Sequence, residues 1–283
     1  MTGLDDARRE VREIADLEDP IARVKQASDL VAGLQEIVSE VSRIRREAVT
    51  ELAAQGHSQV ALAKMLGVAR TRVQQLLTTG PQPERALLGS GALTVSIGGK
   101  WEAQKANPSA VISAEALAAY QVIFDLASGC NLTATYEVVP PPGMVRLNKD
   151  NLIVIGSPRI LPIVSQTLEA DQYLGFDSGA QGWYLRNYET GAVHRSPSDT
   201  GSPSDYAYIG RLPRPDGKGT FLYIAGIHAM GTLGAAHHIA NNIESIYGKV
   251  KNRRWSALVE CRYDPDSRQV EETVFISPIY TTA

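Results

Sequence analysis

Apolar side chains recur at helical spacing through the first part of the chain. From residue 20 onward they fall three and four positions apart and form a wide stripe. The stripe consists of two neighbouring rows: Val24, Val31, Leu34, Val38 and Val41, and Leu30, Ile37 and Ile44. This period predicts an amphipathic helix over about residues 20–55, capped by Asp19 and begun by Pro20. So wide a stripe needs a partner, which is either the preceding helix at about residues 7–17 or the same helix of a second subunit in a short coiled coil.

Residues 58–77 predict two short helices joined by a tight turn. Ser58 is placed to cap the first helix, and Ala63 is small enough to let two helices cross closely. Gly67 can adopt the positive φ that ends a helix. The second helix then docks through Val68, Val73 and Leu76.

The other side chains of the second helix are mostly polar and suit the edges of base pairs. Arginine pairs with guanine and glutamine with adenine, and a helix of this size fits the major groove. Between residues 43 and 77, six basic side chains stand against two acidic ones. We expect the DNA surface to comprise Arg45, Arg46, Gln59, Lys64, Ala69, Arg70, Thr71, Arg72, Gln74 and Gln75, with Arg45, Arg46 and Lys64 on phosphates. The alternative is a three-helix module whose arginines form a solvated or protein-binding face.

This segment resembles the helix-turn-helix of sigma-factor region 4 and of related bacterial regulators. The similarity lies at Ala63, Gly67, Val73 and Leu76, and it covers roughly residues 44–77. The rest of the chain resembles uncharacterised actinobacterial proteins in which such a motif precedes an α/β domain. The resemblance implies a regulator that binds double-stranded DNA, although we recognise no promoter-melting region of a true sigma factor. A single unit of this size usually binds weakly, so we expect a homodimer on paired half-sites.

Helical periodicity stops after Leu77, where proline and glycine become frequent. We therefore place a linker at residues 80–92, between a helical DNA-binding domain at residues 1–79 and a second domain at residues 93–283. The second domain alternates strands and helices, which predicts a three-layer α/β domain with a mixed, largely parallel sheet. Expected strands are 93–97, 132–139, 152–155, 221–225, 255–263 and 270–276; expected helices are 113–128, 160–168 and 232–247; expected hairpin segments are 183–187, 192–195 and 206–211.

Two strand-to-helix junctions, residues 155–159 and 225–234, are rich in glycine. In an open α/β sheet such junctions place helix N-termini where they can bind an anion. We expect a small anionic or nucleotide-like ligand to be bound by Gly156, Ser157, Arg159, Gly226, His228, Gly231 and Thr232. Neither junction matches a nucleotide-binding fingerprint, and tight turns that bind no ligand explain the glycines equally well. The pattern identifies no cofactor and no metal ligands, since adjacent His237 and His238 point in different directions on a helix.

Composition limits these interpretations. The chain is 43% hydrophobic and 21% charged, as ordinary globular proteins are, and its net charge of -3 requires any DNA-binding patch to be local. The two cysteines, Cys130 and Cys261, are too few for a disulfide framework and favour a reduced compartment. No secretory signal or membrane span is recognisable, so we expect a cytoplasmic protein.

The leading hypothesis is a sequence-specific transcriptional regulator whose α/β domain senses a small anionic ligand or a protein partner. The alternative is an enzyme that processes nucleotides or nucleic acids and is recruited to DNA by the helix-turn-helix. Neither G-x-S-x-G nor H-E-x-x-H occurs, so we assign no catalytic residue and favour the regulator. In a third interpretation the second domain is a protein-interaction module.

Overall fold

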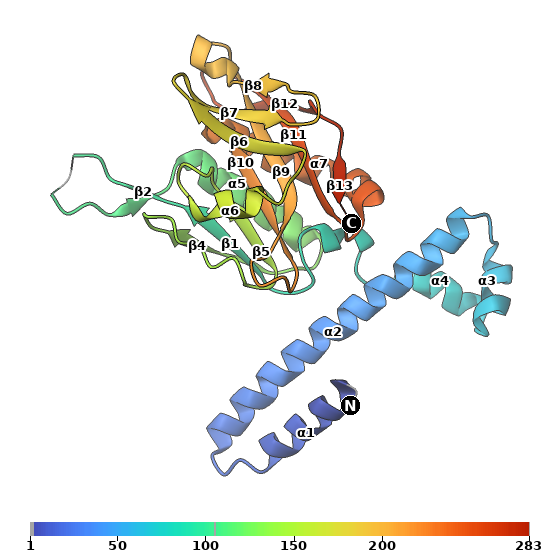
Figure 1. Ribbon diagram of the computed structural model, residues 1–283. Coiled ribbons are helices and arrows are strands. Elements are labelled where there is room, and N and C mark those ends of the chain that lie inside the picture. Colours follow the sequence, from blue (N-terminus) through green and yellow to red (C-terminus); the bar gives the residue numbers. More distant parts are fainter. Residues whose placement is uncertain (1–2, 105, 283) are drawn as a thin grey trace. The chain divides into compact units, whose positions relative to one another are not determined.

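The computed structural model describes residues 3–104 and 106–282, which fold into two compact units. The first unit is Met1–Pro83 and the second is Glu84–Ala283 (Figure 1). In the part of the chain that the structure describes, no helix has both the length and the apolar character needed to cross a bilayer.

The first unit is helical. Its helices are α1 (Gly3–Ala15), α2 (Pro20–Ala54), α3 (Gln59–Leu66) and α4 (Arg70–Thr78). The long helix α2 begins as its sequence indicates, because the Asp19 carboxylate accepts hydrogen bonds from the amides of Ile21 at 3.0 Å and Ala22 at 3.2 Å. Helix α1 turns back beside the start of α2 and buries Ile14 (Figure 1).

A small core joins α3 and α4 to the end of α2. Its buried members are Val49, Leu62, Val73 and Leu76. Ser58 caps α3 by accepting the Ala61 amide at 3.2 Å, and Gly67 ends the helix at a φ of 65°. A left-handed residue at this position lets the chain reverse within three residues, so α4 packs directly against α3.

The second unit is built on a mixed sheet with the strand order β12-β11-β9-β10-β5-β1-β4, and β13 also pairs with β11. Strands β4, β1, β5 and β10 are mutually parallel, whereas β9, β11, β12 and β13 pair antiparallel with their neighbours. The strands are β1 (Leu93–Gly98), β4 (Ala134–Val139), β5 (Leu152–Ile155), β9 (Ser204–Pro213), β10 (Thr220–Gly226), β11 (Arg254–Tyr263), β12 (Val270–Phe275) and β13 (Tyr280–Thr282). The expected mixed sheet is therefore present, and its parallel half contains the glycine-rich junctions.

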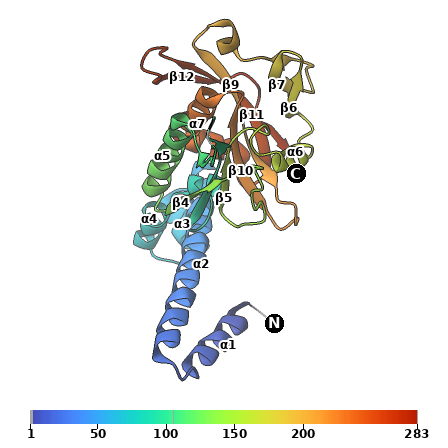
Figure 2. The ribbon, with the colours of Figure 1, turned by 90° about the vertical axis from the view of Figure 1, so that its left-hand side faces the viewer.

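Both faces of this sheet are covered, because side chains alternate between two cores. On one face, α5 (Ala114–Gly129) and α7 (Ala229–Val250) lie side by side over residues such as Ile153 and Ile155 (Figure 2). On the other face, residues such as Val154 and Tyr223 pack beneath α6 and a small sheet. These elements are α6 (Ile163–Leu168), β6 (Leu174–Gly179), β7 (Gly182–Asn187) and β8 (Val193–His194). The third layer is thus mainly β-sheet.

Two segments differ from their sequence-based assignment. Residues 206–211, expected in a hairpin, do pair antiparallel with the following strand β10, but they form the central strand β9 of the main sheet, where the buried Tyr208 hydroxyl donates to Asp171 at 2.8 Å. That bond satisfies the phenol and allows a tyrosine-rich strand to lie in the core. Residues 84–92, expected in the linker, belong to the second unit, because Leu87 and Leu88 are buried in its core.

Candidate functional site

A cavity of about 210 Å³ lies where the parallel strands β1, β5 and β10 end. Gly98, Ile155 and Gly226, the last residues of these strands, all line it. The chain passes from β1 to β4 on one side, and after β5 it re-enters the sheet at β9, beyond β10 on the other side. Ligands of open α/β sheets bind at such a switch point, so this edge of the sheet is the candidate ligand site.

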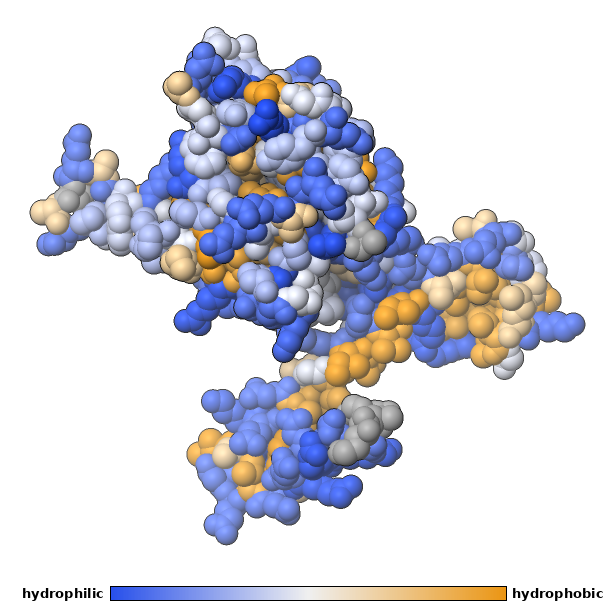
Figure 3. All heavy atoms as spheres, viewed as in Figure 1, coloured by the Kyte–Doolittle hydropathy of each residue, from blue (hydrophilic) through white to orange (hydrophobic). Residues whose placement is uncertain are grey.

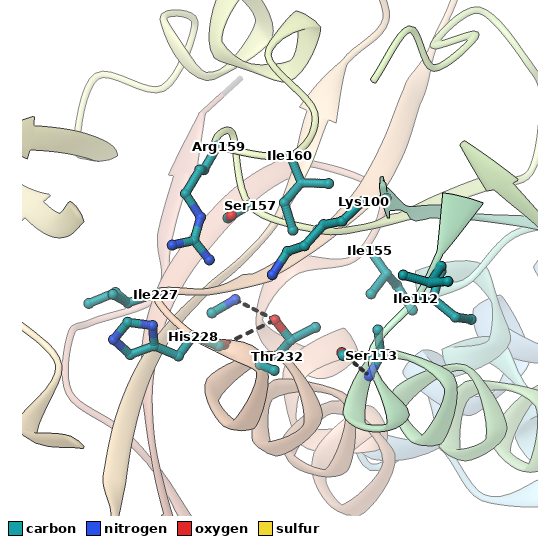
Figure 4. A pocket seen from close by; sticks show the side chains of 16 residues that line it. Lys100, Ile112, Ser113, Ile155, Ser157, Arg159, Ile160, Ile227, His228 and Thr232 are labelled. Atoms are coloured by element: carbon teal, nitrogen blue, oxygen red, sulfur yellow. Dashed lines mark hydrogen bonds between the residues drawn. The ribbon is translucent and has the colours of Figure 1, made fainter. Parts of the chain in front are cut away.

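Six of the seven residues expected to bind a ligand line this cavity: Gly156, Ser157, Arg159, Gly226, His228 and Thr232. Isoleucines form much of the remaining wall, at positions 112, 155, 160 and 227. Figure 4 shows the side chains of Arg159 and Lys100 extending toward the first turn of α7. Among the described residues, none with a negative charge lines the cavity.

Ser157 contributes a hydroxyl with unused hydrogen-bonding capacity to the cavity wall. It is only 8% exposed, and its hydroxyl has no hydrogen-bond partner within the described residues. The neighbouring hydroxyls are engaged: Ser113 accepts the Ala116 amide at 3.1 Å, and Thr232 accepts the Gly226 amide at 2.8 Å. The Ser157 oxygen is not among the fully enclosed unpaired atoms of the described residues, so water or a ligand in the cavity can reach it and hydrogen-bond to it.

Two cations line the cavity without an ion-pair partner among the described residues, Arg159 and Lys100. Sequence reasoning identified Arg159 but assigned no ligand role to Lys100, which follows Gly98 and Gly99 at the end of β1. The sequence does contain a signal for a ligand role of Lys100, because Lys100 follows a buried strand just as Arg159 does. However, residues 97–101 do not form a complete phosphate-binding loop, so the sequence pattern gives Lys100 no ligand role by itself.

Gly226 and Gly231 have a packing role. A Cβ on Gly226 would collide with the carbonyl oxygen of His228 and the amide of Thr232. Gly231 does not line the cavity, and a Cβ there would stand 2.7 Å from the carbonyl oxygen of Tyr206. These glycines therefore let α7 start close to the sheet, which brings the first turn of α7 to the cavity.

Asp205 fixes the start of α7 and was not identified from sequence. Its fully buried carboxylate accepts hydrogen bonds from the amides of His228 at 2.9 Å and Gly231 at 2.8 Å, and from the Ser196 hydroxyl at 2.6 Å. Burial raises the pKa of Asp205, whereas these hydrogen bonds act in the opposite direction. The carboxylate caps the helix from β9, a strand paired with β10.

His228 is oriented by Asp199, whose Oδ1 lies 2.8 Å from its Nε2. Within the described residues no hydrogen bond joins His228 to Ser157, so the cavity holds no nucleophile already paired with a base. The two histidines within α7 do not line the cavity. Burial lowers the pKa of both His237 and His238, and His238 lies beside Phe275 with ring centroids 4.2 Å apart.

The first unit presents a separate polar surface on α4. Five side chains of this helix are solvent-exposed: Arg70, Thr71, Arg72, Gln74 and Gln75. Two hydrogen bonds organise them, from Gln59 to Gln74 at 2.6 Å and from Arg72 to Gln75 at 3.1 Å. Ala69 is also exposed and is the N-cap residue of α4.

The basic side chains around α4 differ in whether they are already hydrogen-bonded or ion-paired within the protein. Lys64 and Arg45 are exposed, whereas Arg46 donates one N–H to the carbonyl oxygen of Gly80 at 2.9 Å. Arg43, which contributed to the local positive charge, is paired within α2 to Glu40 at 2.7 Å and Glu47 at 2.9 Å. Its charge is therefore largely neutralised, and the remaining basic residues carry the positive charge near α4.

Comparison with known proteins leaves these sites to be interpreted from their own chemistry. No protein-family model matches the chain, and neither a curated protein nor a solved structure matches it.

Proposed function

We propose that this protein is a transcriptional regulator that binds duplex DNA through α3 and α4, which act as a helix-turn-helix. The supporting observation is the division of α4 into two faces. Val73 and Leu76 are buried against α2 and α3, while the arginine and glutamine side chains all point to solvent. Exposed groups of these types on a short helix can read base edges in the major groove.

The roles within this surface follow from reach and chemistry. Arg70, Arg72, Gln74 and Gln75 are the groups for base edges, with Gln59 holding Gln74 in place. Lys64 and Arg45 are the groups for phosphates. Arg46 keeps unused N–H groups for a phosphate while its bond to Gly80 anchors the chain that follows α4.

The exposed stripe of α2 supports a homodimer. Figure 3 shows hydrophobic surface along α2 that α1 leaves uncovered. Val24, Val31, Val38 and Val41 of this helix are 67%, 52%, 64% and 58% exposed. Val24, Val31 and Val38 repeat every seven residues, and Leu34 and Val41 follow the second and third valines by three residues. The valines thus occupy the a positions and the residues three further on the d positions of a coiled-coil heptad. A β-branched residue at position a favours a parallel coiled coil of two helices. The proposed occupant is therefore α2 of a second copy.

The cavity of the α/β unit serves, in this proposal, as a sensor for a small anion. Lys100 and Arg159 supply positive charge, and Ser157 supplies a buried donor. The absence of a nucleophile paired with a base, noted for the described residues, favours sensing over catalysis. Anion binding would then shift the dimer between two geometries, of which one matches the spacing of DNA half-sites.

In vitro selection from a random duplex library, with the full chain as bait, tests the DNA-binding proposal. The wild-type protein is expected to enrich a motif with paired half-sites. Arg72→Ala is expected to lose preference at one base pair, because a bidentate contact contributes roughly 1–3 kcal/mol of discrimination. Arg12→Ala removes the same charge from an exposed position on α1 and is expected to enrich the wild-type motif. Equal recovery of all duplexes by the wild-type protein at low salt would overturn the proposal.

A further inference from the structure

The cavity continues into an outer groove of about 520 Å³. Lys100, Arg159 and Ile160 line both spaces, so the two cations lie at their junction. The outer groove is otherwise lined by Gly99, Trp101, Pro141, Pro142 and Pro162. A small inorganic anion at the junction would leave this groove empty, which points to a ligand with an organic part beyond its anionic group.

Trp101 gives the outer groove a flat aromatic wall. It follows Lys100 in the short strand β2 (Lys100–Trp101), which pairs with β3 (Ala110–Val111). Lys100 lines both spaces, whereas Trp101 lines only the outer groove. The indole is 52% exposed and makes no aromatic or cation contact with the described residues. An indole presented in this way can stack on a planar group.

The junction itself is built for a phosphate. Arg159 offers a forked pair of N–H donors, Lys100 a point charge, and the buried Ser157 hydroxyl an unused donor that faces the inner cavity. Among the described lining residues no carboxylate opposes an anion there. The three prolines that line the groove, at 141, 142 and 162, carry no charge.

We propose that the ligand is a phosphomonoester that carries a flat heterocycle, with a nucleoside monophosphate as its simplest form. The phosphate lies between Lys100 and Arg159 and accepts a hydrogen bond from Ser157. The heterocycle stacks on Trp101 in the outer groove. This inference rests on the proposed anion site and adds the chemical class of the ligand to it.

Calorimetric titration of the full chain with three probes separates the two parts of the ligand. Adenosine 5′-monophosphate carries both phosphate and ring, ribose 5-phosphate lacks the ring, and adenosine lacks the phosphate. The wild-type protein is expected to bind the nucleotide more tightly than either partial probe. The other ribonucleoside 5′-monophosphates are titrated in parallel, because stacking tolerates different bases.

Matched variants assign each part. Trp101→Ala is expected to weaken nucleotide binding roughly five- to a hundredfold, the usual effect of losing one stacked base, and to leave ribose 5-phosphate binding unchanged. Trp101→Phe keeps an aromatic face and is expected to retain most of the affinity. Arg159→Gln is expected to weaken both phosphate probes. Quenching of tryptophan fluorescence by the nucleotide, lost in Trp101→Phe, provides an independent readout.

The outcomes distinguish this inference from the proposed function. If every ribonucleotide binds no more tightly than ribose 5-phosphate, or if Trp101→Ala leaves nucleotide affinity unchanged, the ligand class is wrong while the anion site stands. If no phosphate probe binds, both the anion site and the ligand class are wrong.

Discussion

The carboxylate of Asp205 accepts the backbone amide of Gly231 at 2.8 Å, and the same oxygen accepts the His228 amide at 2.9 Å. The His228 amide lies just before α7 and the Gly231 amide lies in its first turn, beside the proposed anion site. Asp205→Ala would leave both amides without their acceptor in a fully buried position. We expect the free energy of unfolding, measured by urea denaturation, to fall by about 2–4 kcal/mol.

Asp205→Asn is the matched control. Its amide oxygen can accept the same two backbone amides, while its NH₂ group can donate to the Ser196 hydroxyl, which lies 2.6 Å from the other carboxylate oxygen. We therefore expect Asp205→Asn to lose much less stability than Asp205→Ala. Equal losses would show that the hydrogen bonds to α7 are not what Asp205 contributes.

The DNA surface predicts different salt behaviour for different arginines. Arg45 is exposed and assigned to a phosphate, so Arg45→Gln should weaken binding to all duplexes alike. The log of the affinity falls with the log of the salt concentration, and the loss of one phosphate contact makes that slope less steep by about 0.9. Fluorescence anisotropy across a salt series, with the selected duplex and a scrambled one, measures both effects. A change in the preferred motif would instead assign Arg45 to base readout.

The exposed valines of α2 predict a dimer, and a charged side chain introduced among them should disrupt it. Val31→Glu would place an unpaired carboxylate in the proposed interface of each copy, and the dissociation constant should rise roughly a hundredfold or more. Gln26→Glu adds the same charge on the other side of α2 and should leave the dimer intact. Analytical ultracentrifugation gives the masses, and circular dichroism checks that the variants remain folded. A wild-type chain that sediments as a monomer at tens of micromolar would exclude this dimer.

Most of the first unit could be predicted from sequence, because its helices begin and end at residues with strong local preferences. The reversal between α3 and α4 depends on Gly67 and Ser58, whose conformational and capping preferences act within a few residues. Helix α2 likewise follows from Asp19, Pro20 and an uninterrupted period. The pairing of Arg43 was also visible in the sequence, because Glu40 and Glu47 lie three and four residues away on the same helix, where side chains are neighbours.

The α/β unit was predictable where neighbouring residues define the structure and less so where distant strands meet. The junction at Gly156 and Ser157 can be recognised in the sequence, because a short apolar strand is followed directly by glycine. Asp205 lies far from Gly231 in sequence and reaches it only because β9 pairs with β10. Trp101 reaches the groove beside Pro141 and Pro142 because β1 and β4 are adjacent in the sheet. Strand order is a long-range property, and local periodicity does not encode it.

The two cysteines should behave as buried core residues. Burial raises the pKa of Cys261 from its ordinary value of 9.0 to about 12, with nearby Asp205 and Glu260 acting in the same direction, and burial also raises the pKa of Cys130. At pH 8 both thiols should be protonated, so Ellman's reagent should react with neither in the native protein and with both after denaturation. Because the unfolded thiol of Cys261 ionises first, its contribution to stability should be present below pH 9 and be lost as pH rises toward about 12. Cys130→Ala leaves Cys261 as the only thiol, and rapid reaction of that variant at pH 8 would contradict this burial.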